Sequence, residues 1–155
     1  MPSASLTRRV TFAAAHRYYR SDWSAERNTE VFGAAANPSF HAHDYVCDVT
    51  VHGPINEITG MVVDLGALDS ALQREVHDRF QGRDINLDVA EFADGRLVPT
   101  CENLALFIFE RLQSALGKNV ALTRVIVRED ETLSAEVETG FRIQGSGGKG
   151  TRKDQ

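Results

Sequence analysis

Residues 41–53, HAHDYVCDVTVHG, alternate between apolar and mostly polar side chains. In an extended strand, successive side chains point to opposite faces, so one face would carry Tyr45, Cys47, Val49 and Val51. This pattern predicts a half-buried β-strand that ends at Gly53-Pro54. His41 and His43 begin the stretch, and a strand would hold both imidazoles on one face, about 7 Å apart.

A second strand-like run, residues 5–16, ends at His16, which shares a face with Val10, Phe12 and Ala14. If these two strands are neighbours, three imidazoles meet at one point. Neutral imidazole is a common zinc ligand, and three histidines that leave a fourth position open are typical of a catalytic site. The spacing is equally compatible with a polar strand edge, because no short motif fixes the third ligand.

The remaining elements follow from periodicity and capping. Residues 17–40 lack periodicity and read as a long loop. Asp64 is a candidate N-cap for a helix over 65–80, with an apolar stripe at Leu68, Leu72, Val76 and Phe80. A second helix is predicted from Pro99 and Thr100 to about residue 116, and strands are predicted over 119–129 and 132–143, with a turn at 129–131.

The order strand, strand, helix, helix, strand, strand predicts an α+β fold, a four-stranded antiparallel sheet with two helices on one face. Residues 1–144 are expected to form a single domain, and the Gly-rich residues 145–155 a flexible polar tail. Such a sheet has two open edges, which pairing with other subunits would close. A homo-oligomer is therefore expected.

Composition and charge limit the classes of function that the chain can have. The chain has 155 residues, 42% hydrophobic and 25% charged, with a net charge of −5. Nucleic acid is not expected as a partner, because a chain with this net negative charge gives no sign of a basic surface that would bind phosphates. No apolar run approaches membrane-spanning length. With two cysteines and no recognisable signal peptide, a cytoplasmic location is expected. Cys101 falls near a predicted helix start, a position where the pKa of a thiol can be lowered.

Several ordered motifs resemble the 6-pyruvoyltetrahydropterin synthase and 6-carboxytetrahydropterin synthase family. They are FAAAH at 12–16, NPSFHAHDY at 37–45, TGMVVDL at 59–65, TCENLA at 100–105 and VRE at 127–129. The resemblance extends from about residue 6 to residue 143. It implies the tunnelling fold, in which the sheets of several subunits join into a barrel, usually in a hexamer of two stacked trimers.

The resemblance also implies a Zn²⁺ site at His16, His41 and His43, and a small-molecule substrate bound near a subunit interface. It implies that Glu129 binds a pterin-like ring through amidine-type nitrogens, a task that suits a carboxylate because it can accept two parallel N–H bonds. Thr100 and Glu102 would support the same pocket. From the residues alone, Glu129 would be a solvated turn carboxylate, Thr100 a helix N-cap and Glu102 a favourable charge in a first helical turn.

The chain departs from the family at its acid–base groups. The family's cysteine base lies six or four residues before the first histidine of the H-x-H pair, and these positions hold Ala35 and Asn37. The family's Asp-His pair falls on Gln81 and Gly82. None of these side chains can abstract a proton near neutral pH.

Weak candidates for replacement catalytic groups are Glu30, Asp84 and His77, with Glu26, Asp22, Tyr18, Tyr19 and Arg17 as further neighbours of the predicted ligands. The first hypothesis is a zinc-dependent enzyme repurposed for a lyase, aldol-type or cyclisation step on a pterin-like or other metabolite. One alternative is a working pterin or deazapterin synthase with relocated bases. Another is a catalytically silent pterin- or metal-binding paralogue.

Overall fold

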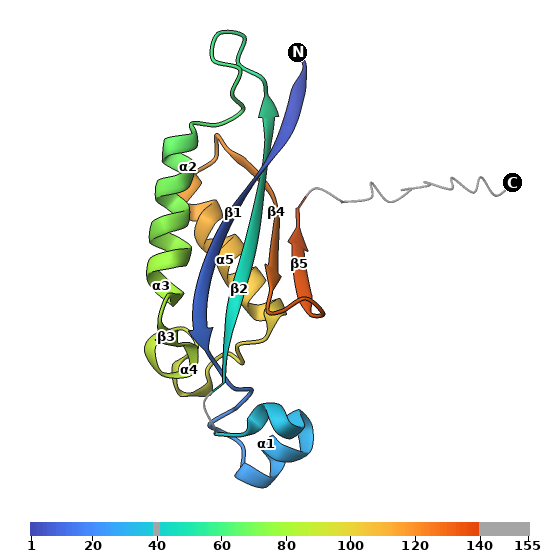
Figure 1. Cartoon of the computed structure of the whole chain (residues 1–155), viewed down its shortest axis with the longest axis vertical. Helices are drawn as coiled ribbons and strands as arrows, with labels where there is room; N and C mark the ends of the chain where they lie inside the picture. Colours follow the sequence, from blue (N-terminus) through green and yellow to red (C-terminus); the bar gives the residue numbers. More distant parts are fainter. Residues whose placement is uncertain (39–40, 140–155) are drawn as a thin grey trace, which may run out of the picture.

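Two long strands form the centre of the sheet. In the computed structural model, which describes residues 1–38 and 41–139, β1 (Ser3–Ala15) and β2 (Ala42–Pro54) pair antiparallel along their whole length. β4 (Ala121–Arg128) pairs with β2, and β5 (Ser134–Glu138) pairs with β4, both antiparallel (Figure 1). The four predicted strands and their antiparallel pairing are confirmed.

A fifth strand lies outside β1. β3 (Arg83–Asp84) runs parallel to the end of β1, so the order across the sheet is β3-β1-β2-β4-β5. The prediction of four strands is wrong by this one element, since two residues are too few to show an alternation. β3 matters for the site because it pairs with Ala14 and Ala15, directly before His16.

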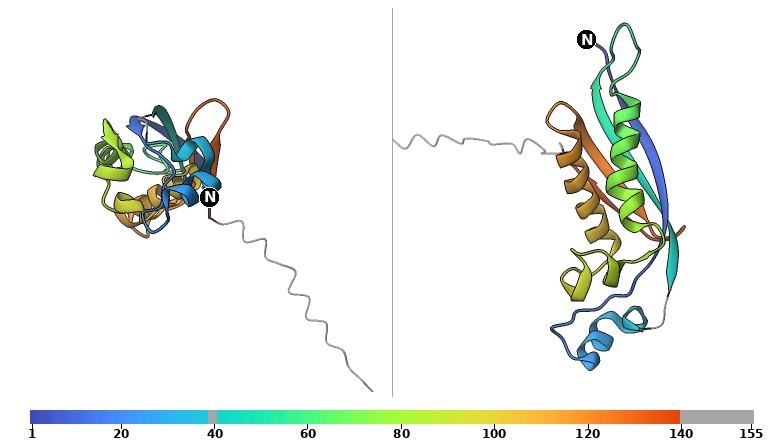
Figure 2. Two further views of the ribbon diagram at one scale, coloured as in Figure 1. Left: turned by 90° about the horizontal axis from the view of Figure 1, so that it is seen from below. Right: turned by 90° about the vertical axis from the view of Figure 1, so that its left-hand side faces the viewer.

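Both predicted helices cover one face of the sheet (Figure 2). The first is one continuous rod made of α2 (Leu65–Leu72), a π-helical segment η2 (Gln73–His77) and α3 (Asp78–Phe80). The second is α5 (Cys101–Leu116). The Asp64 carboxylate accepts from Ala67 N and the Thr100 hydroxyl accepts from Asn103 N, so both predicted N-caps are present.

The core lies between the sheet and these helices. Phe12 stacks between Tyr45 and Phe80, with ring centroids 4.9 and 5.0 Å away. The predicted stripe residues Leu68, Leu72, Val76 and Phe80 are at most 2% exposed, and so are Leu104, Ile108 and Leu112 of α5. The predicted stripe of α5 extends to Ala115, which is exposed, so periodicity identified the buried faces except at that last position.

The reading of residues 17–40 as a loop is wrong in part. The segment contains α1 (Ala25–Phe32), capped by Ser24, and a 3-10 turn η1 (Gly33–Ala36). Its anchor is Asn28, 1% exposed, whose side-chain amide accepts from Arg20 N and donates to Arg20 O and Ser24 O. Asn28 is the residue that α1 buries, so a search for a stripe of buried apolar side chains does not reveal this helix. Two more short helices, α4 (Ile85–Asp88) and η3 (Ala93–Gly95), precede α5.

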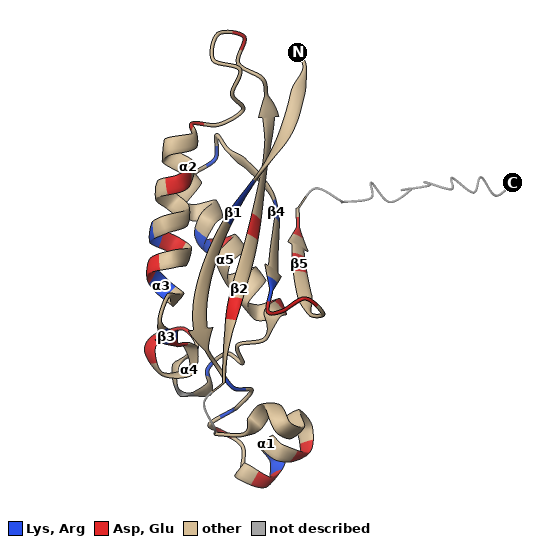
Figure 3. Cartoon of the chain, viewed as in Figure 1, with Lys and Arg blue, Asp and Glu red and all other residues tan. Residues whose placement is uncertain are grey.

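The predicted turn between the last two strands is present. Asp130 Oδ1 accepts from Thr132 N and Leu133 N, and Glu129 N donates to Leu133 O. Residues 140–143 of the predicted last strand and the tail 145–155 lie outside the described residues. Among the residues that the structure does describe, no helix is long and apolar enough to span a membrane. Acidic and basic residues are interspersed along the described part of the chain (Figure 3).

Candidate metal centre

Three imidazoles gather where β1 ends and β2 begins. His16 directly follows β1, and its backbone N–H donates to the His41 carbonyl at 3.1 Å, which continues the ladder by one step. The ring centroids of His16, His41 and His43 are 4.8 to 5.1 Å apart. The two strands therefore bring the three predicted histidines together.

A carboxylate completes this cluster. Glu129 directly follows β4, is 8% exposed, and places Oε1 2.7 Å from His16 Nε2 and 3.0 Å from His43 Nε2. One ligand atom from each of His16, His41, His43 and Glu129 can be chosen so that all four lie within 4.8 Å of one another. The description of Glu129 as a solvated turn residue is wrong, because the turn directs it inward.

The contacts inside the cluster do not satisfy its nitrogens. His16 Nε2 and His43 Nε2 are buried and have no hydrogen-bond partner among the described residues. Glu129 Oε1 lies within ion-pair distance of both nitrogens, but it forms a hydrogen bond with neither. Buried polar atoms are nearly always paired, so these two nitrogens could bind a further group.

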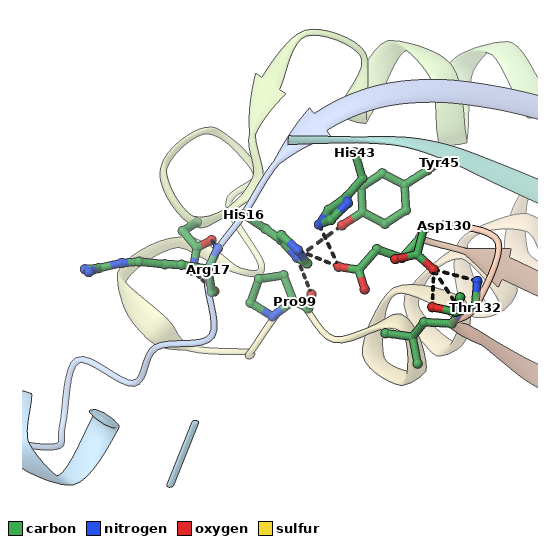
Figure 4. A network of polar contacts seen from close by, with 10 residues as sticks. His16, Arg17, His43, Tyr45, Pro99, Asp130 and Thr132 are labelled. Atoms are coloured by element: carbon green, nitrogen blue, oxygen red, sulfur yellow. Dashed lines mark hydrogen bonds and ion pairs between the residues drawn. The ribbon is translucent and has the colours of Figure 1, made fainter. Parts of the chain in front are cut away.

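The hydrogen bond that His16 Nδ1 makes on the far side of the ring determines the tautomer of the imidazole. Nδ1 lies 2.8 Å from the Pro99 carbonyl oxygen (Figure 4). Because a carbonyl can only accept, the proton is on Nδ1 and the lone pair is on Nε2. Burial lowers the pKa of His16, against the opposing effects of the Pro99 carbonyl and Glu129. The imidazole is therefore neutral at pH 7, which is the form that binds metal.

A cavity of about 330 Å³ adjoins the cluster. Its lining includes His16, His41, Arg17, Tyr19, Asp84 and Asn86. The Arg17 guanidinium lies 4.0 Å from the centre of the Tyr19 ring. Both Asn86 amide atoms bind the Arg17 backbone, so α4 fixes the chain directly after the first histidine.

The other predicted site residues lie in different surroundings. Asp84 lines the cavity, and its carboxylate caps α4 by accepting from Asn86 N. Thr100 caps α5, and Glu102 is exposed in the first turn of that helix. The remaining candidates, Glu26, Glu30, Asp22 and His77, are at the surface or partly exposed, and none of them lines the cavity. Tyr18 contacts the edge of His16, with ring centroids 5.6 Å apart.

The residues at the positions where the resemblance leads one to expect acid–base groups make structural contacts. The Gln81 side-chain oxygen accepts from Ala13 N, and Gly82 N donates to Ala13 O. Gly82 has φ +70°, a conformation that favours glycine. Ala35 O accepts from Tyr18 N. These residues hold the edge of β1 and the segment before β2 without a proton-transfer group.

Neither cysteine is suited to act as a base near neutral pH. Cys101 begins α5 as expected, but it is 2% exposed, and burial, followed by the charge of Glu129, raises its pKa to about 11. Burial raises the pKa of Cys47 to about 12. Both thiols are protonated at pH 7, so the helix start does not acidify Cys101.

Sequence reasoning missed two members of the site. Tyr45 was assigned only to the core, although its hydroxyl lies 3.1 Å from His16 Nδ1. Its place two residues after His43, on the same strand face, was the available signal. Pro99 acts through its carbonyl, which no side-chain pattern reveals.

An α+β fold that holds three histidines and a buried glutamate beside a cavity defines an enzyme-like scaffold with a candidate metal centre. The family model described as 6-pyruvoyl tetrahydropterin synthase matches residues 5–140. The chain belongs to this family.

Individual relatives agree with this assignment. The human 6-pyruvoyl tetrahydrobiopterin synthase is 38% identical over 128 residues, which are 83% of this chain and 86% of that protein. The structure of Caenorhabditis elegans 6-pyruvoyl tetrahydropterin synthase superimposes with a TM-score of 0.83 at 31% identity, covering 90% of this chain and 98% of that chain. A more distant relative, the dihydroneopterin monophosphate aldolase of Pyrococcus furiosus, is 27% identical over 135 residues, 87% of this chain and 97% of that protein.

Proposed function

We propose that the chain is a zinc-dependent enzyme whose metal ligands are His16, His41 and His43. The observation that carries this proposal is the pair of buried Nε2 atoms that lack a hydrogen-bond partner, beside a buried carboxylate oxygen. Lone pairs and a negative charge gathered in one buried place favour a cation there. Three histidines that leave a fourth position open are typical of a catalytic zinc site.

When bound, zinc would supply a Lewis acid that polarises a carbonyl or hydroxyl of the substrate. The protein's own residues would bind and orient that substrate. Glu129 would accept two N–H bonds from the edge of a pterin-like ring, with Thr100 and Glu102 supporting the pocket from the start of α5. The cavity along Arg17 and Asp84 would take the part of the substrate beyond the cluster.

We further propose that the reaction is a lyase, aldol-type or cyclisation step that differs from the usual synthase reaction. The absence of acid–base side chains at Ala35, Asn37, Gln81 and Gly82 supports this. Loss of a positioned base typically costs about 10²- to 10⁴-fold in rate. Asp84 is the best-placed replacement, because it lines the cavity with two of the histidines. The relative named as an aldolase makes an aldol-type step a reasonable first test.

One observation favours a working pterin synthase with relocated bases, namely the 38% identity to a relative with that name. A catalytically silent pterin- or metal-binding paralogue is the third possibility. The sheet supports assembly into a homo-oligomer, because the outer edge of β5 and most of the outer edge of β1 pair with no strand among the described residues. A hexamer is favoured because of the family resemblance. A cytoplasmic location stays a prediction.

The test uses the purified protein with about one equivalent of zinc. Turnover of dihydroneopterin triphosphate to the family's product would favour the retained synthase. Aldol cleavage of dihydroneopterin monophosphate would favour the repurposed enzyme, and pterin binding without turnover of either compound would favour the silent paralogue. Absence of zinc binding by elemental analysis and titration would refute the metal site itself.

A Glu129→Gln variant separates the two roles open to that carboxylate. A ring-binding role predicts a large loss of pterin affinity with zinc affinity nearly unchanged. A metal-ligand role predicts loss of zinc affinity in the absence of any pterin. Glu131→Gln, an exposed carboxylate in the same turn, is the matched control.

A further inference from the structure

The back of the His16 ring has two oxygen neighbours rather than one. Nδ1 lies 2.8 Å from Pro99 O and 3.1 Å from the Tyr45 hydroxyl oxygen (Figure 4). Pro99 precedes the N-cap of α5, and Tyr45 belongs to β2. The segment before α5 and a central strand thus meet at one nitrogen, on the side of the ring that faces away from the cluster.

The Tyr45 ring is fixed by packing that does not involve its hydroxyl. The residue is 0% exposed, and its ring stacks on Phe12 at 4.9 Å with an interplanar angle of 14°. The same ring meets His16 and His43 edge-on, with centroids 5.9 and 5.7 Å apart. The phenol therefore lies against two of the three imidazoles in a position that the core determines.

The chemistry of these contacts has one consistent arrangement. The Pro99 carbonyl needs a donor, so the Nδ1–H points to it, and the Tyr45 hydroxyl oxygen lies within reach of the same N–H. A proton shared by two oxygens stays on Nδ1, which keeps the lone pair on Nε2. It also restricts rotation of the imidazole about its bond to Cβ.

We propose that Tyr45 is a positioning residue for the metal centre, because its hydroxyl, together with Pro99 O, fixes the tautomer and the orientation of His16. This inference rests on the proposed function, in which the histidine cluster binds zinc. Partners of this kind, which bind the second nitrogen of a ligating histidine, typically contribute 10- to 100-fold, about 1.4 to 2.7 kcal/mol, to metal affinity.

The test compares Tyr45→Phe with Tyr18→Phe. Tyr45→Phe removes one oxygen and keeps the ring that packs on Phe12. Tyr18→Phe is the matched control, because its ring also touches His16 while no hydrogen bond between its hydroxyl and the imidazole is present. Each metal-free protein is first checked for its fold and its melting temperature. Zinc affinity is then measured by competition with a chromophoric chelator, and Co²⁺ is used as a spectroscopic probe of ligand geometry.

We expect Tyr45→Phe to bind zinc about 10- to 100-fold more weakly and to shift the Co²⁺ absorption bands, while Tyr18→Phe resembles the wild type. Equal zinc affinity of Tyr45→Phe and wild type overturns the inference and leaves the proposed metal site intact. Failure of the wild type to bind zinc overturns both. Failure of metal-free Tyr45→Phe to fold also overturns the inference, because the hydroxyl would then serve the fold rather than the ligand.

Discussion

Zinc should stabilise this protein to an extent that depends on a single half-buried histidine. The perturbation is His41→Ala. His41 is only half-buried, and among the described residues no hydrogen bond reaches its ring, which touches His16 and His43 edge-on. Its removal from the metal-free protein should therefore cost about 1 kcal/mol or less, as for a partly exposed side chain without a special role.

The effect with zinc present is much larger. At free zinc 100-fold above its Kd, binding to the folded state adds about 2.7 kcal/mol. A domain of this size gains about 2–4 °C in Tm per kcal/mol, so the wild type should gain about 5–11 °C. If loss of His41 weakens binding 100-fold, the Kd equals the free zinc concentration and only about 0.4 kcal/mol remains.

Differential scanning calorimetry with buffered zinc measures both quantities. His77→Ala is the control, since His77 contacts Gln73 and Asp78 on the first helical rod and lies outside the cluster. It should keep the full zinc-dependent gain. An undiminished gain in His41→Ala would refute the assignment of His41 as a ligand.

Three further predictions concern the scaffold. Glu75→Gln should lower the free energy of unfolding by about 1.5–3 kcal/mol at pH 7, because the buried carboxylate accepts from Arg79 and Arg111. Burial opposes ionisation of Glu75, but these hydrogen bonds prevail and its pKa lies below the ordinary 4.5. The folded state thus favours the carboxylate, and in urea titrations the wild-type advantage should shrink as the pH falls below 4.5 through the folded-state pKa; an advantage that grows on acidification would contradict this. Leu104→Ala, at a position that is 0% exposed, should cost about 2–5 kcal/mol in chemical denaturation, and a cost below 1 would mean that the site is not well packed. Gly82→Ala should cost about 1–2 kcal/mol because of its φ of +70°, a value that thermal unfolding can check and that a neutral result would rule out.

The sequence predicts those parts of the fold that bury one regular face. The alternation in residues 41–53 and the stripe from Leu68 to Phe80 reflect half-buried elements, and both are found where expected. α1 escapes prediction because Asn28 anchors it through hydrogen bonds, and β3 because it has only two residues. Local periodicity carries no information about either kind of contact.

The same distinction applies to the residues of the candidate site, some of which follow from local alternation and others only from three-dimensional packing. The three histidines converge because strand pairing is set by the same alternation that makes the strands recognisable. The burial of Glu129 depends on a turn that directs it inward, and its position was expected only through the family resemblance. The contacts of Pro99 and Tyr45 with His16 arise from three-dimensional packing between segments that are distant in the chain.

The order of these segments has a consequence for biosynthesis. The three imidazoles come from the first two strands, whereas the carboxylate follows β4 and the carbonyl behind His16 precedes α5. A nascent chain on the ribosome would expose the histidines long before their remaining partners emerge. Tight metal capture should thus await synthesis of β4 and of the Glu129 that follows it, so that an ion held firmly marks a polypeptide in which these later segments of the site have been made.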